Sequence, residues 1–150
     1  MKKSPKGISY IDPLHAGRHP FQTYLLLLCI IAGLPILFGR IGASSIESEL
    51  PFWLAFSWAL LLFLGSAIGL VGAYWRGDPA NALTIERIGL AVVGSAACVY
   101  AVVIIINTGW DRLIPAGITA AFGFASLRRA RDIGQVIKMA IEDLKIEAAE

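Results

Sequence analysis

Few side chains in this 150-residue sequence have the types and spacing that chemistry requires. His15 and His19 lie four residues apart, a spacing that on a helix would place two imidazoles on one face as metal ligands. Gly17 and Pro20 lie beside them and disfavour a stable helix there. We therefore predict no metal site at the two histidines.

Cys29 and Cys98 form the second candidate pair, and both fall inside long apolar segments. Free cysteines in such surroundings behave as small buried hydrophobic residues, so neither a disulfide nor a metal site is expected. The sequence also contains no phosphate-binding glycine loop and no hydrolase motif built on a serine or a zinc site. We predict that the chain is not an enzyme and uses no cofactor.

Glu86 and Arg87 are the ionisable pair nearest to a long apolar segment, residues 88–106. Charged groups inside a bilayer are costly and typically serve transport or proton relay. We instead predict an interfacial pair, with Thr84 capping the next helix, Glu86 in its first turn and Arg87 reaching the headgroups. A gate or a partner contact is the alternative role. On this interpretation the apolar segments contain no ionisable side chain.

The surrounding elements are strongly apolar. Hydrophobic residues make up 57% of the chain and charged residues 16%, with a mean hydropathy of +0.69, whereas soluble domains have about 45–50% and about 25%. Charged residues are missing from four stretches, 21–39, 50–75, 88–110 and 113–127. A helix needs roughly 20 apolar residues to cross a bilayer. We predict an all-α membrane protein with four transmembrane helices, at about 21–38, 52–75, 88–106 and 110–127.

The first and the fourth of these segments leave alternatives open. The first could be a cleaved signal peptide with residues 42–44 as its cleavage site, although its apolar run exceeds the roughly 7–15 residues of such signals. The fourth is short for a span unless its helix begins near Gly109 or the bilayer thins locally.

Lysine and arginine predict the orientation. In a four-span topology, eleven of the 13 positive residues fall on the side of both termini, and only Arg40 and Arg112 fall on the other. Retained positive charge marks the cytoplasmic side, so we predict that both termini are cytoplasmic. The chain then divides into a basic tail (1–20), a transmembrane domain (21–127) and an amphipathic cytoplasmic helix (128–150).

Small residues recur on one face of three predicted spans. In lipid, helices associate by close backbone packing, which glycine and alanine permit. Gly65 and Gly69 have GxxxG spacing, and Gly72 extends their face. We predict helix-packing seams, within the chain or between copies, at seven positions: Gly65, Gly69, Gly72, Gly94, Ala116, Ala120 and Gly123.

The segment 128–150 carries a single apolar stripe with helical periodicity. Its members are Ile133, Val136, Ile137, Ala140, Ile141 and Leu144. Such a helix could lie on the membrane surface, pack on another copy of the chain, or dock on a cytoplasmic protein. The predicted partners are thus the lipid bilayer, a second copy and a cytoplasmic protein, and we expect no nucleic acid.

Several stretches also carry a family resemblance. They are 50–58 (LPFWLAFSW), 69–77 (GLVGAYWRG), 85–90 (IERIGL) and 100–102 before a short Gly-Trp turn, within residues 20–132. Their order resembles that of small four-helix membrane proteins encoded by bacteriophages of actinobacteria. The resemblance implies a phage protein that acts in the host cytoplasmic membrane, and it supplies no catalytic residues.

The leading functional hypothesis is a holin-like protein, which accumulates, self-associates and permeabilises the host membrane during lysis. The small size, the predicted spans, the glycine and alanine seams and the charged cytoplasmic tail favour it. One alternative is a membrane anchor that recruits phage or host factors for assembly through residues 128–150. Another is a superinfection exclusion factor.

Overall fold

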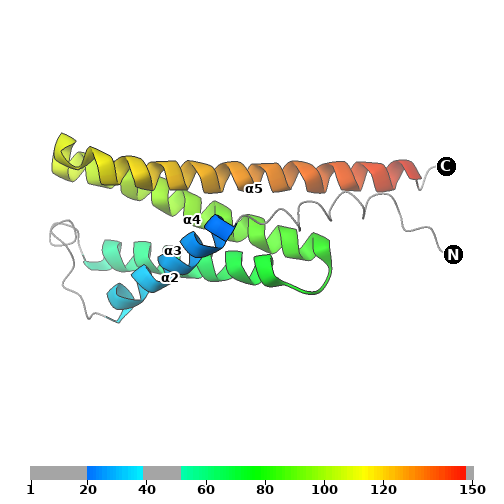
Figure 1. The fold of residues 1–150 in the computed structure, drawn as a ribbon, viewed down its shortest axis with the longest axis horizontal. Coiled ribbons are helices and arrows are strands. Elements are labelled where there is room, and N and C mark those ends of the chain that lie inside the picture. Colours follow the sequence, from blue (N-terminus) through cyan, green and yellow to red (C-terminus); the bar gives the residue numbers. More distant parts are fainter. Residues whose placement is uncertain (1–19, 39–51, 148–150) are drawn as a thin grey trace.

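The computed structural model of the chain describes residues 20–38 and 52–147 (Figure 1). Its elements are α2 (Pro20–Leu37), α3 (Phe52–Tyr74), α4 (Pro79–Thr108), the short 3-10 helix η1 (Gly109–Arg112) and α5 (Leu113–Glu147). No strand occurs in these two ranges, so the predicted all-α class is confirmed. The histidine pair, residues 1–19 of the basic tail and the alternative cleavage site at residues 42–44 lie outside the described residues.

Two of the helices are long and apolar enough to cross a membrane, over Trp53–Tyr74 in α3 and Pro79–Asn107 in α4. α2 contributes a shorter apolar stretch, Phe21–Pro35. In α5 the apolar half ends at Leu127, and charged residues follow from Arg128 onward without a break in the helix. The described chain therefore holds four long helices, of which two meet the length and composition of a span.

α4 begins earlier than predicted because Asp78 and Pro79 start it. The Asp78 carboxylate accepts a hydrogen bond from the backbone N of Ala80 at 3.2 Å, and proline is well suited to the first helical turn. The prediction that Thr84 caps this helix is wrong, since its hydroxyl donates to the carbonyl of Ala80 at 2.8 Å within the helix. Glu86 consequently lies in the helix interior rather than in a first turn.

The helices pack in sequence order, α2 against α3, α3 against α4 and α4 against α5. α4 and α5 run antiparallel along much of their length, and α2 crosses α3 obliquely (Figure 1). The start of α3 and the connection between α4 and α5 lie at one end of the molecule, called here the turn end. The connection between α3 and α4 lies at the other, called here the charged end, past which α5 continues.

The buried core draws on all four long helices. Leu26 of α2, Leu62 of α3, Leu90 and Val93 of α4, and Ile133 of α5 belong to one cluster. Large apolar side chains also face outward on every one of these helices, among them Leu28, Ile31, Leu64, Val102 and Ile118. Soluble proteins expose such residues singly rather than along every element, so this surface favours an apolar surrounding.

Glycines bring the backbones of α3 and α4 together. A Cβ atom added at Gly89 would overlap the backbone N of Gly69, and one added at Gly72 would overlap the backbone N of Glu86. Gly65 lies against the same helix. The GxxxG face of α3 therefore packs against α4 within one chain, which leaves it unavailable to a second copy.

A second seam joins α4 to α5. A Cβ atom at Gly94 would lie 2.9 Å from the carbonyl oxygen of Gly123, and one at Gly123 would lie 2.6 Å from the sulfur of Cys98. Ala116 is buried nearer to the turn end, and Ala120 is half-buried. These contacts allow the two helices to run close together over a long distance.

Candidate functional site

Glu86 is a carboxylate buried near the charged end, where side chains from three helices meet. Glu86 is 1% exposed, although it belongs to α4, one of the two helices that are long and apolar enough to cross a membrane. Gly72 of α3 packs closely against the backbone of Glu86 and covers one side of this residue. A buried carboxylate is costly unless it is paired and hydrogen-bonded, so its partners determine what it can do.

Gln22 of α2 and Arg129 of α5 supply those partners. The Nε2 atom of Gln22 donates to Oε1 of Glu86 at 3.3 Å, and Nε of Arg129 lies 3.8 Å from the same oxygen. The second carboxylate oxygen and the Nε atom of Arg129 have no hydrogen-bond partner among the described residues. We call Gln22, Glu86 and Arg129 the buried polar cluster, which joins three helices and balances one negative charge with one positive charge.

The sequence did not predict this cluster. The predicted span 88–106 contains no ionisable group, but the helix that contains it extends back to Pro79, and Glu86 is buried within this extension. Glu86 is buried because the helix begins at Pro79 and packs against α3 at Gly72, and its position at a membrane interface stays a prediction. Gly72 was the available signal, since a glycine near the end of a packing seam lets the facing helix exclude water from the residue opposite.

Arg87 follows Glu86 but contacts a different surface. Its side chain is exposed and lies over α5, where a Cβ atom at Gly134 would come within 2.9 Å of its guanidinium carbon. The pairing of α4 with α5 thus continues beyond the apolar half of α5. That Arg87 reaches lipid headgroups stays a prediction.

A cavity of about 220 Å³ lies beside the buried polar cluster, between α2, α4 and α5. Its lining residues are Phe21, Gln22 and Leu25 of α2, Leu90 of α4, and Phe122, Ala125, Ser126 and Arg129 of α5. Most of these side chains are apolar, and Arg129 is the one charged residue among them. The cavity therefore combines hydrocarbon walls with a single cationic group.

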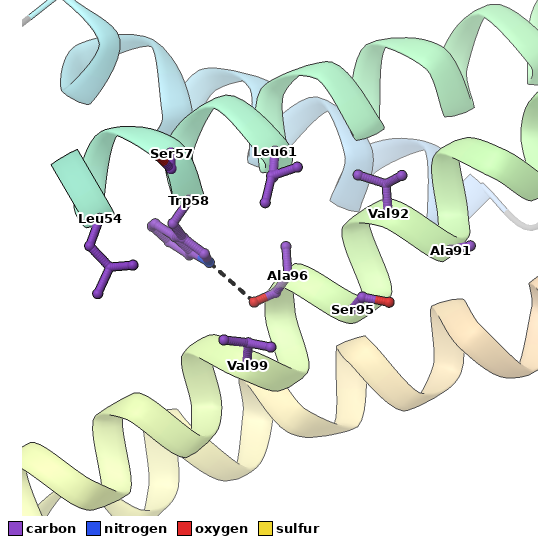
Figure 2. A pocket seen from close by; sticks show the side chains of 9 residues that line it. All are labelled: Leu54, Ser57, Trp58, Leu61, Ala91, Val92, Ser95, Ala96 and Val99. Atoms are coloured by element: carbon purple, nitrogen blue, oxygen red, sulfur yellow. Dashed lines mark hydrogen bonds between the residues drawn. The ribbon is translucent and has the colours of Figure 1, made fainter.

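A larger groove of about 480 Å³ lies between α3 and α4 (Figure 2). Trp58 projects into it, donates from Nε1 to the carbonyl oxygen of Ala96 at 3.2 Å, and stacks on Tyr100 with ring centroids 3.9 Å apart. The hydroxyl of Ser57 donates a hydrogen bond to the carbonyl oxygen of Trp53 at 2.7 Å. The remaining lining residues are Leu54, Leu61, Ala91, Val92, Ser95 and Val99, so the groove offers mainly hydrocarbon contacts.

The apolar stripe of α5 divides into a packed part and an uncovered part. Its first four members are fully or partly buried against the bundle: Ile133, Val136, Ile137 and Ala140. Ile141 and Leu144 are 48% and 49% exposed. α5 runs past the connection between α3 and α4 (Figure 1), so the described chain does not cover these last two residues.

The two cysteines are free and lie at different places in the fold. Cys98 contacts Gly123 in the seam between α4 and α5, whereas Cys29 is half-buried on α2, which packs mainly against α3. Within residues 20–38 and 52–147, no group of three His, Cys, Asp or Glu side chains comes together as a metal site.

Comparison with known proteins identifies no relative, since no protein-family model, no curated protein and no solved structure matches the chain.

Proposed function

We propose that the chain is a non-enzymatic phage protein of the host cytoplasmic membrane, in which all four long helices cross the bilayer and both ends are cytoplasmic. The outward apolar side chains of every long helix support this proposal. So does the charge distribution, because Asp111 and Arg112 are the only charged residues that the described chain places at the turn end. Trp53 and Trp110 are exposed at that end, a level that tryptophan favours in membranes.

Topology can be tested with single cysteines. Cys29 and Cys98 are replaced by alanine, and one new cysteine is placed at an exposed residue, W110C at the turn end or K145C at the charged end. We expect a membrane-impermeant maleimide to label W110C in intact spheroplasts and K145C only after permeabilisation, because the positive-inside rule places Lys145 in the cytoplasm. Labelling of both cysteines from outside, or of neither, would contradict the proposed topology.

We propose further that copies of the chain self-associate as a holin does, through the groove between α3 and α4. The open groove supports this proposal, because the GxxxG face of α3 already packs against α4 within the chain and is not available to a second copy. Ala91 and Ser95 lie one turn apart on α4 and line the groove, which the described chain leaves open. Small residues at this spacing let a helix of a second copy approach closely in lipid.

Filling the groove tests self-association. We expect S95L, alone or with A91L, to weaken association of fluorescently labelled copies in liposomes by at least about tenfold, which corresponds to about 1.4 kcal/mol. Membrane depolarisation by the expressed protein should fall in parallel. The matched control is G117L, since Gly117 is exposed on α5 and has no atom within 4 Å of an added Cβ. Unchanged association and depolarisation for S95L would refute the holin-like role.

The second candidate is a membrane anchor that acts through the end of α5. The uncovered Ile141 and Leu144 favour it, since they continue a stripe whose earlier members are packed. A chain that ends at Ala140 separates the two functions. If the protein acts as a holin does, this shortened chain should still associate and depolarise the membrane. If it acts as an anchor, the shortened chain should lose phage assembly and no other function.

A further inference from the structure

We infer that the cavity between α2, α4 and α5 binds one anionic phospholipid, with an acyl chain along its apolar walls and the phosphate at Arg129. This inference rests on the proposed membrane location. Phosphate and guanidinium groups match in geometry and charge, so an arginine at the end of a hydrocarbon-lined cavity suits a phospholipid.

The cavity has an apolar part and a cationic end along α5. Phe122, Ser126 and Arg129 line it on successive turns of this helix, over roughly 10 Å at 1.5 Å per residue. Leu25 and Leu90 close the apolar part from α2 and α4. A free inorganic anion would gain nothing from these walls, whereas the methylene groups of a lipid would be buried against them.

The cationic end lies where a headgroup would be. Arg129 belongs to the first turn after the apolar half of α5, on the side that the proposed topology makes cytoplasmic. Basic pockets between membrane helices on that side are suited to anionic headgroups. Arg128 and Arg131 are exposed on the same turn and add positive potential without lining the cavity.

Arg129 also retains capacity to bind. Its contact with Glu86 is an ion pair at 3.8 Å through Nε, longer than a hydrogen bond. The side chain is 21% exposed and lines the cavity, so part of it is accessible to a ligand there. Phe21 and Gln22, in the first turn of α2, line the same cavity, and the positive end of that helix dipole favours an anion there.

The test uses the full-length protein in detergent micelles that contain phosphatidylglycerol and phosphatidylcholine with identical acyl chains. Native mass spectrometry then measures which lipids remain bound. We expect one phosphatidylglycerol molecule to be retained in preference to phosphatidylcholine. R129Q should weaken this binding about fivefold, the effect of one basic residue near an anionic membrane, whereas R128Q should change it less than about twofold.

A second variant leaves the charges intact. A125L fills the cavity with a side chain from α5 and should also reduce phosphatidylglycerol binding, whereas A121L, at an exposed alanine outside the cavity, should not. The proposal is overturned if the protein retains both lipids equally. It is also overturned if R129Q or A125L leaves phosphatidylglycerol binding unchanged. Displacement of the bound lipid by excess inorganic phosphate would identify a simple anion site and overturn it as well. The cysteine-labelling result is independent of these outcomes, so a failed lipid site is distinguishable from a failed topology.

Discussion

Replacing Gly89 with alanine should destabilise the protein by about 3 kcal/mol, at the upper end of what overpacked cores typically show. An added Cβ atom would overlap the backbone of Gly69 and lie 2.7 Å from the carbonyl oxygen of Gly65. Backbone atoms cannot rotate away as side-chain ends can, so α3 and α4 would have to separate. Because Gly72 faces Glu86 along the same seam, the separation would also open the buried polar cluster.

The measurement is unfolding of purified G89A in detergent, followed by circular dichroism. The matched control is G117A, because an added Cβ atom at Gly117 meets nothing within 4 Å. Alanine is the better helix former, so the control should be neutral or more stable by up to about 1 kcal/mol. If G89A and G117A unfolded at the same denaturant concentration, the close approach of α3 and α4 described here would be wrong.

Replacing Arg129 with alanine should also destabilise the protein by about 3 kcal/mol, because it leaves a buried carboxylate without its cation. Glu86 is 1% exposed and, among the described residues, would retain only the hydrogen bond from Gln22. The reverse change, E86Q, should be milder, since Arg129 is already 21% exposed and can turn toward water. R129A should therefore destabilise the protein more than E86Q does.

Two further variants identify the cause. R128A removes the neighbouring exposed arginine and should change stability by less than about 0.5 kcal/mol. The double variant E86L/R129M replaces the whole ion pair with apolar groups of similar size, and it should recover most of the stability lost in R129A. A double variant as unstable as R129A would show that arginine packing, rather than its charge, stabilises this region.

The sequence predicted α2 and α3 well because their boundaries coincide with gaps in charge. The predicted ranges 21–38 and 52–75 compare with Pro20–Leu37 and Phe52–Tyr74. The same criterion failed at the start of α4, since an absence of charge indicates an apolar surrounding and does not define where a helix begins. Residues 79–87 include the charged pair Glu86 and Arg87 yet are helical, because this part of α4 packs against α3 and α5.

The site was harder to predict than the helices. Periodicity identified the glycine face of α3 but could not say which helix it meets, and Gly89, which makes the closest approach, was not among the predicted positions. The buried polar cluster joins residues 22, 86 and 129, which are far apart in sequence. Only the order of helix packing, which no local pattern contains, brings these three side chains together.

That order of packing has a consequence for synthesis. Each helix packs mainly against the one made immediately before it, so a chain emerging from the ribosome meets every main partner in turn. The exception is the hydrogen bond from Gln22 of α2 to Glu86 of α4, and the ion pair of Glu86 with Arg129 forms only when α5 is in place. Until then, the carboxylate made near the middle of the chain lacks its cation, and α5 completes the charge balance of the helices made before it.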